Sequence, residues 1–273
     1  YQPAVELAQG HLVVVPLNGT NYHLDLNAIQ TALSPATRMI ILNVPNNPTG
    51  SSWSEKDLAA LDDLLHGTDI IVLSDEVYAP MQYDGRRALS LSNHPRLSER
   101  ALVAASFGKI LHATGWKIGY LLGPVELMKE VRKIHQYDVF STGAPLQAGI
   151  ASFLNSPSGQ NHLIDLPAFY QEKRDRFLNG LVGSHWNWSP AESGYFQILD
   201  YGDFETQEDS RIVQTWCKKG PKDGIALIPL SSFYPSGIPK NHSPFRVRVC
   251  FAKNGSTLDE GVRRLLLLSN PQR

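Results

Sequence analysis

The chain is poor in the features that mark disulfide-stapled, membrane-spanning and nucleic-acid-binding proteins. Its 273 residues include only two cysteines, Cys217 and Cys250, which excludes a disulfide framework and does not match the spacing of a metal site. No apolar run approaches the roughly 20 residues needed to cross a bilayer. The formal net charge is −1, with no long run of like charge. We therefore expect no metal, membrane or nucleic-acid partner, and reduced thiols in a cytoplasmic location.

What the sequence does contain is an alternation of apolar runs and helix-forming segments in its first half. Residues 39–42, 70–73 and 102–105 are short apolar runs without polar alternation, which is typical of strands in a parallel sheet. Further strands are predicted at 11–17 and 118–122, and helices at 26–33, 54–65 and 125–137. This order predicts an α/β fold with an open, mostly parallel sheet.

The pattern changes after about residue 155. A long helix is predicted at 166–181 and a second helix at 209–218, with a final one at 257–267. Short strands are predicted at 195–199, 225–228 and 246–251. These segments predict a smaller α+β domain, so we divide the chain at 1–155 and 156–273.

Polar segments follow three of the predicted strands. They are 43–50 (NVPNNPTG), 74–78 (SDEVY) and 106–109 (SFGK), the last followed by 115–120 (GWKIGY). Because the carboxyl ends of parallel strands meet at one edge of a sheet, these segments are expected to converge. A lysine beside a hydroxyl and a second cation suits an aldehyde cofactor that carries a phosphate, since the amine can form a Schiff base while the other groups hold the phosphate.

Taken together and in this order, the segments resemble the fold type I, pyridoxal-phosphate-dependent aminotransferases, and within them the methionine and kynurenine aminotransferase branch. The resemblance runs from residue 1 to about 267 and includes 193–196 (SGYF), 228–231 (IPLS) and 247–253 (VRVCFAK). It implies a three-layer α/β/α cofactor-binding domain over 1–155, a smaller C-terminal domain over 156–273, and a homodimer. Relatives carry a long segment before the position of Tyr1, so we expect the chain to lack its N-terminal part.

The resemblance also implies the activity. An L-amino acid, such as methionine, an aromatic residue, kynurenine or glutamine, would give its amino group to a 2-oxo acid, with pyridoxal 5′-phosphate as the cofactor.

Four residues would contact the cofactor ring by this resemblance. Lys109 would form the Schiff base and later move a proton, while Asp75 would pair with the pyridine nitrogen. Tyr78 and Asn47 would hydrogen-bond the phenolic oxygen of the ring. Asn46, in the same Pro/Asn cluster, is expected only to shape the turn.

Three more residues complete the predicted site. Ser106 and Lys117 would bind the phosphate, although most relatives have arginine at the second position and lysine lacks its bidentate fork. Arg248 would hold the substrate α-carboxylate, together with Asn47, because a planar fork suits a carboxylate. Arg246, on the same strand face, is expected to pair with an acidic residue, and His112 is expected to be a packing residue.

Two alternatives remain open at this point. A C–S β-lyase on the same fold would use the same lysine, aspartate, tyrosine and arginine. An inactive remnant, or one part of a split assembly, would also fit a chain that lacks its N-terminal segment.

Overall fold

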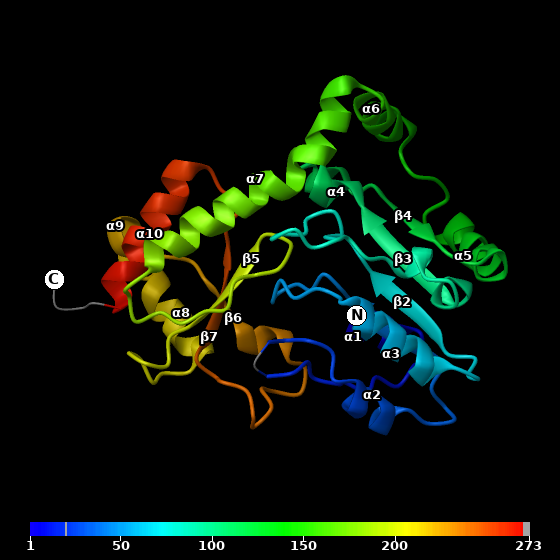
Figure 1. Ribbon diagram of the computed structural model, residues 1–273, viewed down its shortest axis with the longest axis horizontal. Helices are drawn as coiled ribbons and strands as arrows, with labels where there is room; N and C mark the ends of the chain where they lie inside the picture. Colours follow the sequence, from blue (N-terminus) through cyan, green and yellow to red (C-terminus); the bar gives the residue numbers. More distant parts are fainter. Residues whose placement is uncertain (20, 270–273) are drawn as a thin grey trace.

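The computed structural model describes residues 1–19 and 21–269, which form two sheets bridged by a long helix (Figure 1). The first sheet has the order β1-β2-β3-β4. Its strands are β1 (Met39–Asn43), β2 (Ile71–Asp75), β3 (Ala101–Ser106) and β4 (Gly119–Leu122). The first three strands are parallel and β4 is antiparallel to β3. The predicted mostly parallel α/β sheet is confirmed.

Helix α3 (Glu55–Leu65) covers one face of this sheet. Its buried residues Leu58, Leu61 and Leu65 join Leu42 and Val72 of the strands in one hydrophobic cluster. Truncating a fully buried leucine such as Leu61 to alanine is expected to cost about 2–5 kcal/mol. The helix begins with a capping box, in which a serine and an aspartate three residues apart bond each other's backbone N–H groups.

The strand predicted at 11–17 is wrong. These residues form no strand, and Val13 and Val14 are exposed. A strand exists only through hydrogen bonds to a neighbour, and within the described part of the chain β1 pairs with β2 alone. The segment connects two short helices, α1 (Gln2–Leu7) and α2 (Leu26–Ala32).

After β3 the chain forms α4 (Phe107–Ile110), and after β4 it forms α5 (Val125–Asp138), as predicted for 125–137. Helix α6 (Ala144–Leu154) was not predicted. Helix α7 (Pro157–Leu181) starts nine residues before the predicted 166, because Ser156 caps it and a proline occupies its first turn, where no N–H partner is needed.

The second sheet has the order β5-β7-β6 and is antiparallel. Its strands are β5 (Phe196–Asp200), β6 (Ile228–Pro229) and β7 (Arg246–Cys250). The strand predicted at 225–228 is wrong except for its last residue, because the Ile225 N–H bonds instead to the carbonyl of Trp216. The helices of this part are α8 (Asp209–Cys217), α9 (Gly220–Asp223) and α10 (Gly255–Ser269).

Helix α7 runs from α6 to the second sheet, where it packs against α10 (Figure 1). Arg176 of α7 and Asp259 of α10 form a two-point ion pair, with Nε–Oδ1 and Nη2–Oδ2 distances of 2.9 and 2.6 Å. A hydrophobic core that includes Phe177 and Leu181 fills the space below the helix. Helix α7 therefore connects the region of the first sheet to the second sheet.

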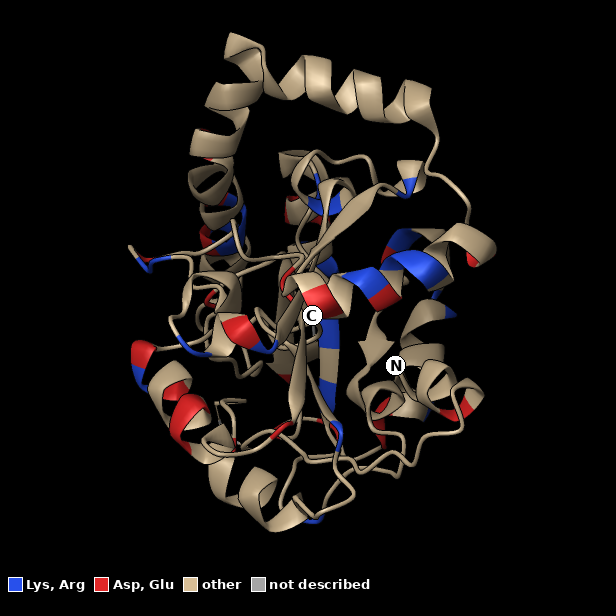
Figure 2. Ribbon diagram, turned by 90° about the vertical axis from the view of Figure 1, so that its right-hand side faces the viewer, with Lys and Arg blue, Asp and Glu red and all other residues tan. Residues whose placement is uncertain are grey.

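Short 3₁₀ helices complete the fold: η1 (Leu91–Asn93), η2 (Leu97–Glu99), η3 (Thr114–Trp116) and η4 (Leu230–Phe233). Basic and acidic residues are interspersed along the ribbon and do not gather by sign (Figure 2). None of the helices described is long and apolar enough to span a membrane. The described residues also contain no cluster of three or more histidine, cysteine or acidic side chains that could hold a metal.

Candidate active site

Asp75 ends β2, and the loop over 43–50 is tied to that strand end. The Asn43 side-chain amide donates to the Asp75 carbonyl at 3.1 Å, while its Oδ1 accepts from the Asn47 N–H at 2.9 Å. Asn46 shapes the turn, as expected, because its Oδ1 accepts from both the N–H and the hydroxyl of Thr49. The loop is thereby folded back so that Asn47 lies at the carboxyl edge of the sheet.

Tyr78 stands next to the lysine that follows β3. The Lys109 Nζ lies 6.0 Å from the centre of the Tyr78 ring, and it makes no hydrogen bond or ion pair with any residue that the structure describes. Tyr78 is 3% exposed and packs edge-on against Tyr195 and Phe196. Burial, followed by its interaction with Tyr195, raises the pKa of the Tyr78 hydroxyl. The lysine amine thus has no polar partner among the described residues and lies beside a phenol that stays neutral.

Arg248 of β7 joins the same site from the second sheet. Its Nη1 donates to Asn47 Oδ1 at 2.7 Å. Its guanidinium lies between two rings, 4.1 Å from the centre of Phe196 and 5.1 Å from that of Phe233. Burial lowers the pKa of the Arg248 guanidinium. Its Nε is buried and has no hydrogen-bond partner among the described residues, and an unpaired buried donor on a cation calls for an anionic acceptor.

Ser106 and Lys117 lie at the neighbouring strand ends. Ser106 caps α4, with its Oγ accepting from the Gly108 N–H at 3.2 Å, and it pairs in register with Gly119 of β4. Lys117 comes two residues before Gly119 and adopts a left-handed backbone, with φ of 56°. The two residues therefore occupy adjoining positions at one end of β3 and β4.

Arg246 pairs with an acidic residue and His112 packs against other side chains, as expected for each. Arg246 bonds Asp200 through Nε at 2.9 Å, and its Nη1 donates to the Gly19 carbonyl and the Tyr22 hydroxyl. The His112 ring packs against side chains of α7.

Tyr1 and Phe233 also belong to this region, although no sequence pattern selected them. The Tyr1 hydroxyl donates to Asp75 Oδ2 at 2.5 Å across 74 residues. Burial, reinforced by the carboxylate of Asp75, raises the pKa of this hydroxyl. The other oxygen of Asp75 accepts only a long bond, 3.4 Å, from the Val77 N–H. No local motif encodes the bond of Tyr1 to Asp75 or the contact of Phe233 with Arg248, because in both cases the partners are distant in sequence.

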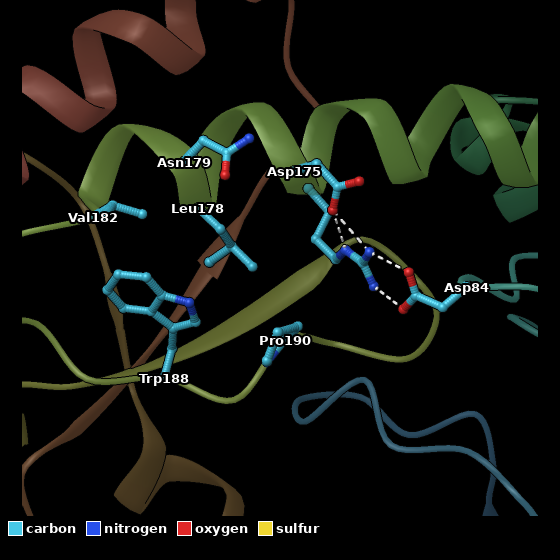
Figure 3. A pocket seen from close by; sticks show the side chains of 8 residues that line it. Asp84, Asp175, Leu178, Asn179, Val182, Trp188 and Pro190 are labelled. Carbon is cyan, nitrogen blue, oxygen red and sulfur yellow. Dashed lines mark hydrogen bonds and ion pairs between the residues drawn. The ribbon is translucent and has the colours of Figure 1, made fainter.

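A surface pocket of about 270 Å³ lies elsewhere, between α7 and the segment that precedes β5 (Figure 3). Its one buried cation, Arg174, is already satisfied: it bonds both oxygens of Asp84 at 2.6 and 2.7 Å and also contacts Asp175. Trp188 and Leu178 form the apolar part of its wall. No predicted site residue lines this pocket, so it does not compete with the site at the sheet edge.

Comparison with known proteins finds the same family across almost the whole chain. The family model "Aminotransferase class I and II" matches residues 1–265. Methionine aminotransferase of Escherichia coli is 38% identical over 265 residues, covering 97% of this chain and 66% of its own length. Human kynurenine–oxoglutarate transaminase 1 is 32% identical over 297 residues, covering 97% of this chain and 69% of its own length.

A solved structure shows the same similarity in three dimensions. The crystal structure of YbdL from Escherichia coli, described as having a methionine aminotransferase function, has a TM-score of 0.91 at 37% identity, covering 97% of this chain and 68% of that chain. The chain thus spans about two thirds of the length of the relatives that it matches.

Proposed function

Because the chain belongs to the class I and II aminotransferases, we propose that it carries the residues for pyridoxal-phosphate-dependent transfer of an amino group from an L-amino acid to a 2-oxo acid. The observation that carries this proposal is the convergence of Lys109, Tyr78, Asn47 and Arg248, which come from both sheets, around one point. Asp75 lies at the same edge of the first sheet.

The donor set fits the cofactor. The unpaired amine of Lys109 suits the aldehyde of the cofactor. The carboxylate of Asp75, one oxygen of which accepts a long hydrogen bond of 3.4 Å, suits the pyridine nitrogen. The amide and the phenol at this site suit the phenolic oxygen. When bound, pyridoxal phosphate supplies a ring that accepts electrons from the substrate Cα. We assign the ring contacts to Asp75, Tyr78 and Asn47, and the phosphate contacts to Ser106 and Lys117.

The roles of the chain's own groups follow from this arrangement. Lys109 would hold the cofactor through its amine, and, once the amino group of the substrate has taken its place there, the released amine would take a proton from the substrate Cα. Arg248 binds the α-carboxylate through its unpaired Nε edge, while Asn47 fixes the other side of the guanidinium. Holding the carboxylate orients the Cα–H bond toward the lysine, which lowers the entropic part of the barrier.

We further propose that the substrate side chain is uncharged and bulky, as in methionine, an aromatic amino acid, kynurenine or glutamine. The aromatic walls formed by Tyr195, Phe196 and Phe233 support this choice, and so do the names of the two relatives compared above. A homodimer in the cytoplasm is part of the same proposal, and the two free cysteines agree with a reducing compartment.

Borohydride trapping tests the assignment of Lys109. The full natural protein is loaded with pyridoxal phosphate, reduced with borohydride and mapped by peptide mass spectrometry. We expect the cofactor on Lys109, and none on the Lys109→Ala variant, while Lys129→Ala, which changes an exposed lysine paired with Glu126, should label normally. Label on another lysine, or no label at all, would refute the proposal.

A product assay separates the two reactions that this site could perform. With methionine and a 2-oxo acid, transamination should yield a new 2-oxo acid in proportion to the acceptor consumed. A cysteine conjugate that releases pyruvate without any acceptor would instead identify a β-lyase, and a protein that binds cofactor but turns over neither substrate would be an inactive relative.

A further inference from the structure

The helix that carries Lys109 is a single turn, and its end is held from outside. A helix leaves its last carbonyls without partners inside the helix. In α4 the Phe107 and Gly108 carbonyls accept from the Leu111 and Ala113 N–H groups. The carbonyl of Ile110, the last residue of the helix, bonds to the imidazole Nε2 of His162 at 2.7 Å, 52 residues further along the chain.

This bond is part of a larger contact between the Lys109 turn and α7. His112, whose φ of 55° is in the left-handed region, places its ring 5.2 Å from that of His162. The same ring lies 5.8 Å from Phe169 and 5.6 Å from Tyr170, both on α7. The strained backbone at His112 is thus stabilised by ring packing, and among the described residues the hydrogen bond from His162 to the Ile110 carbonyl is the polar attachment of this cluster.

The attachment does not require a charge on His162. A carbonyl only accepts, so Nε2 must carry a hydrogen, which it does in the imidazolium and in one neutral tautomer. The contact connects the two halves of the site, because α7 continues to the C-terminal sheet that bears Arg248 and is fixed there by the pairing of Arg176 with Asp259.

We infer that His162 is a positioning residue for Lys109. By holding the Ile110 carbonyl, it fixes the one-turn helix from which the lysine side chain extends, and so the direction in which the amine points. This inference rests on the proposed role of Lys109 as the reactive amine. His162 itself touches no reacting atom.

Two substitutions separate the hydrogen bond from the packing. His162→Phe keeps a ring against His112 but removes the donor, whereas His162→Gln supplies an amide N–H at a similar reach. His185→Phe, which changes an exposed histidine, is the matched control. All three are made in the full natural protein.

Hydrogen exchange of the cofactor-free protein gives a readout that does not depend on activity. In His162→Phe we expect the amides of Leu111 and Ala113 to exchange at least about tenfold faster, with the urea unfolding midpoint close to that of the wild type. His162→Gln should restore most of the protection. Unchanged local exchange in His162→Phe, or faster exchange throughout the chain, would overturn the inference.

Kinetics provide the second readout. In His162→Phe we expect kcat to fall about tenfold, while KM for the amino acid stays within about twofold, because a misdirected amine slows the reaction without changing carboxylate binding. If His162→Gln is as defective as His162→Phe, the ring and not the donor matters, and the inference fails. A wild-type protein that never labels on Lys109 would refute the proposed function, whereas the exchange data would still decide whether His162 holds the turn.

Discussion

Replacing Arg248 with lysine tests the substrate side of the site most directly. Lysine keeps the positive charge but loses the planar fork, so it can replace the bond to Asn47 or the bond from the unpaired Nε, but not both. A hydrogen bond to a charged group contributes about 1.5–3 kcal/mol. Since each 1.4 kcal/mol is about a tenfold change, kcat/KM should fall roughly 10- to 100-fold, mainly through a higher KM for the amino acid.

The chain offers a matched control two residues away on the same strand. Arg246→Lys also loses a fork, but its partners are Asp200, Tyr22 and Gly19, none of which is assigned to the reaction. We expect Arg246→Lys to lower the unfolding midpoint while kcat/KM stays within about twofold. The assay is the initial rate of 2-oxo acid formation at varied methionine concentration.

A substrate without the carboxylate sharpens the test. The amine obtained by decarboxylating methionine cannot use Arg248, so wild type and Arg248→Lys should process it equally poorly. The reasoning would be refuted if Arg248→Lys lost less than about threefold in kcat/KM on methionine, or if Arg246→Lys lost as much.

Three further predictions concern the cofactor and the fold. Tyr1→Phe removes the hydrogen bond from the Tyr1 hydroxyl to Asp75, which is worth roughly 1 kcal/mol at a half-exposed position. The dissociation constant for pyridoxal phosphate, measured by absorption titration, should therefore rise about fivefold, and an unchanged or lower constant would contradict the role assigned to this contact. Arg174 holds the pKa of Asp84 below its usual value. The ion pair therefore stabilises the folded state above the unfolded pKa of about 3.9, and this contribution is lost as the pH falls below it. Asp84→Asn should lower the free energy of unfolding by about 1 kcal/mol in urea at pH 7, and the difference from wild type should shrink toward about pH 3. Gly50→Ala should destabilise the protein by about 1–3 kcal/mol more than Gly67→Ala. Both glycines have a positive φ, but only at Gly50 would the new methyl group lie 2.6 Å from another side chain. Equal unfolding midpoints would show that the loop moves to accommodate the methyl group.

The order of helices and strands in the first half could be predicted because it depends on neighbours in sequence. Ser54 and Asp57 are three residues apart, and their capping box forms wherever that helix forms. Asn46 shapes its turn through Thr49, again three residues away. By contrast, the predicted strand at 11–17 depends on a partner strand, and no local pattern can supply one.

The candidate site divides in the same way. The sequence itself determined which chemical groups stand at the strand ends, since Asp75, Ser106 and Lys109 follow apolar runs that are typical of buried strands. Only the tertiary structure decided what each group faces: Asn47 meets Arg248 across 201 residues, Tyr1 reaches Asp75 across 74, and His162 reaches the end of the lysine helix across 52. The physical reason is that hydrogen bonds and ring contacts act over a few ångströms in space, and distance along the chain does not report them until packing of the two sheets and α7 has brought the partners together.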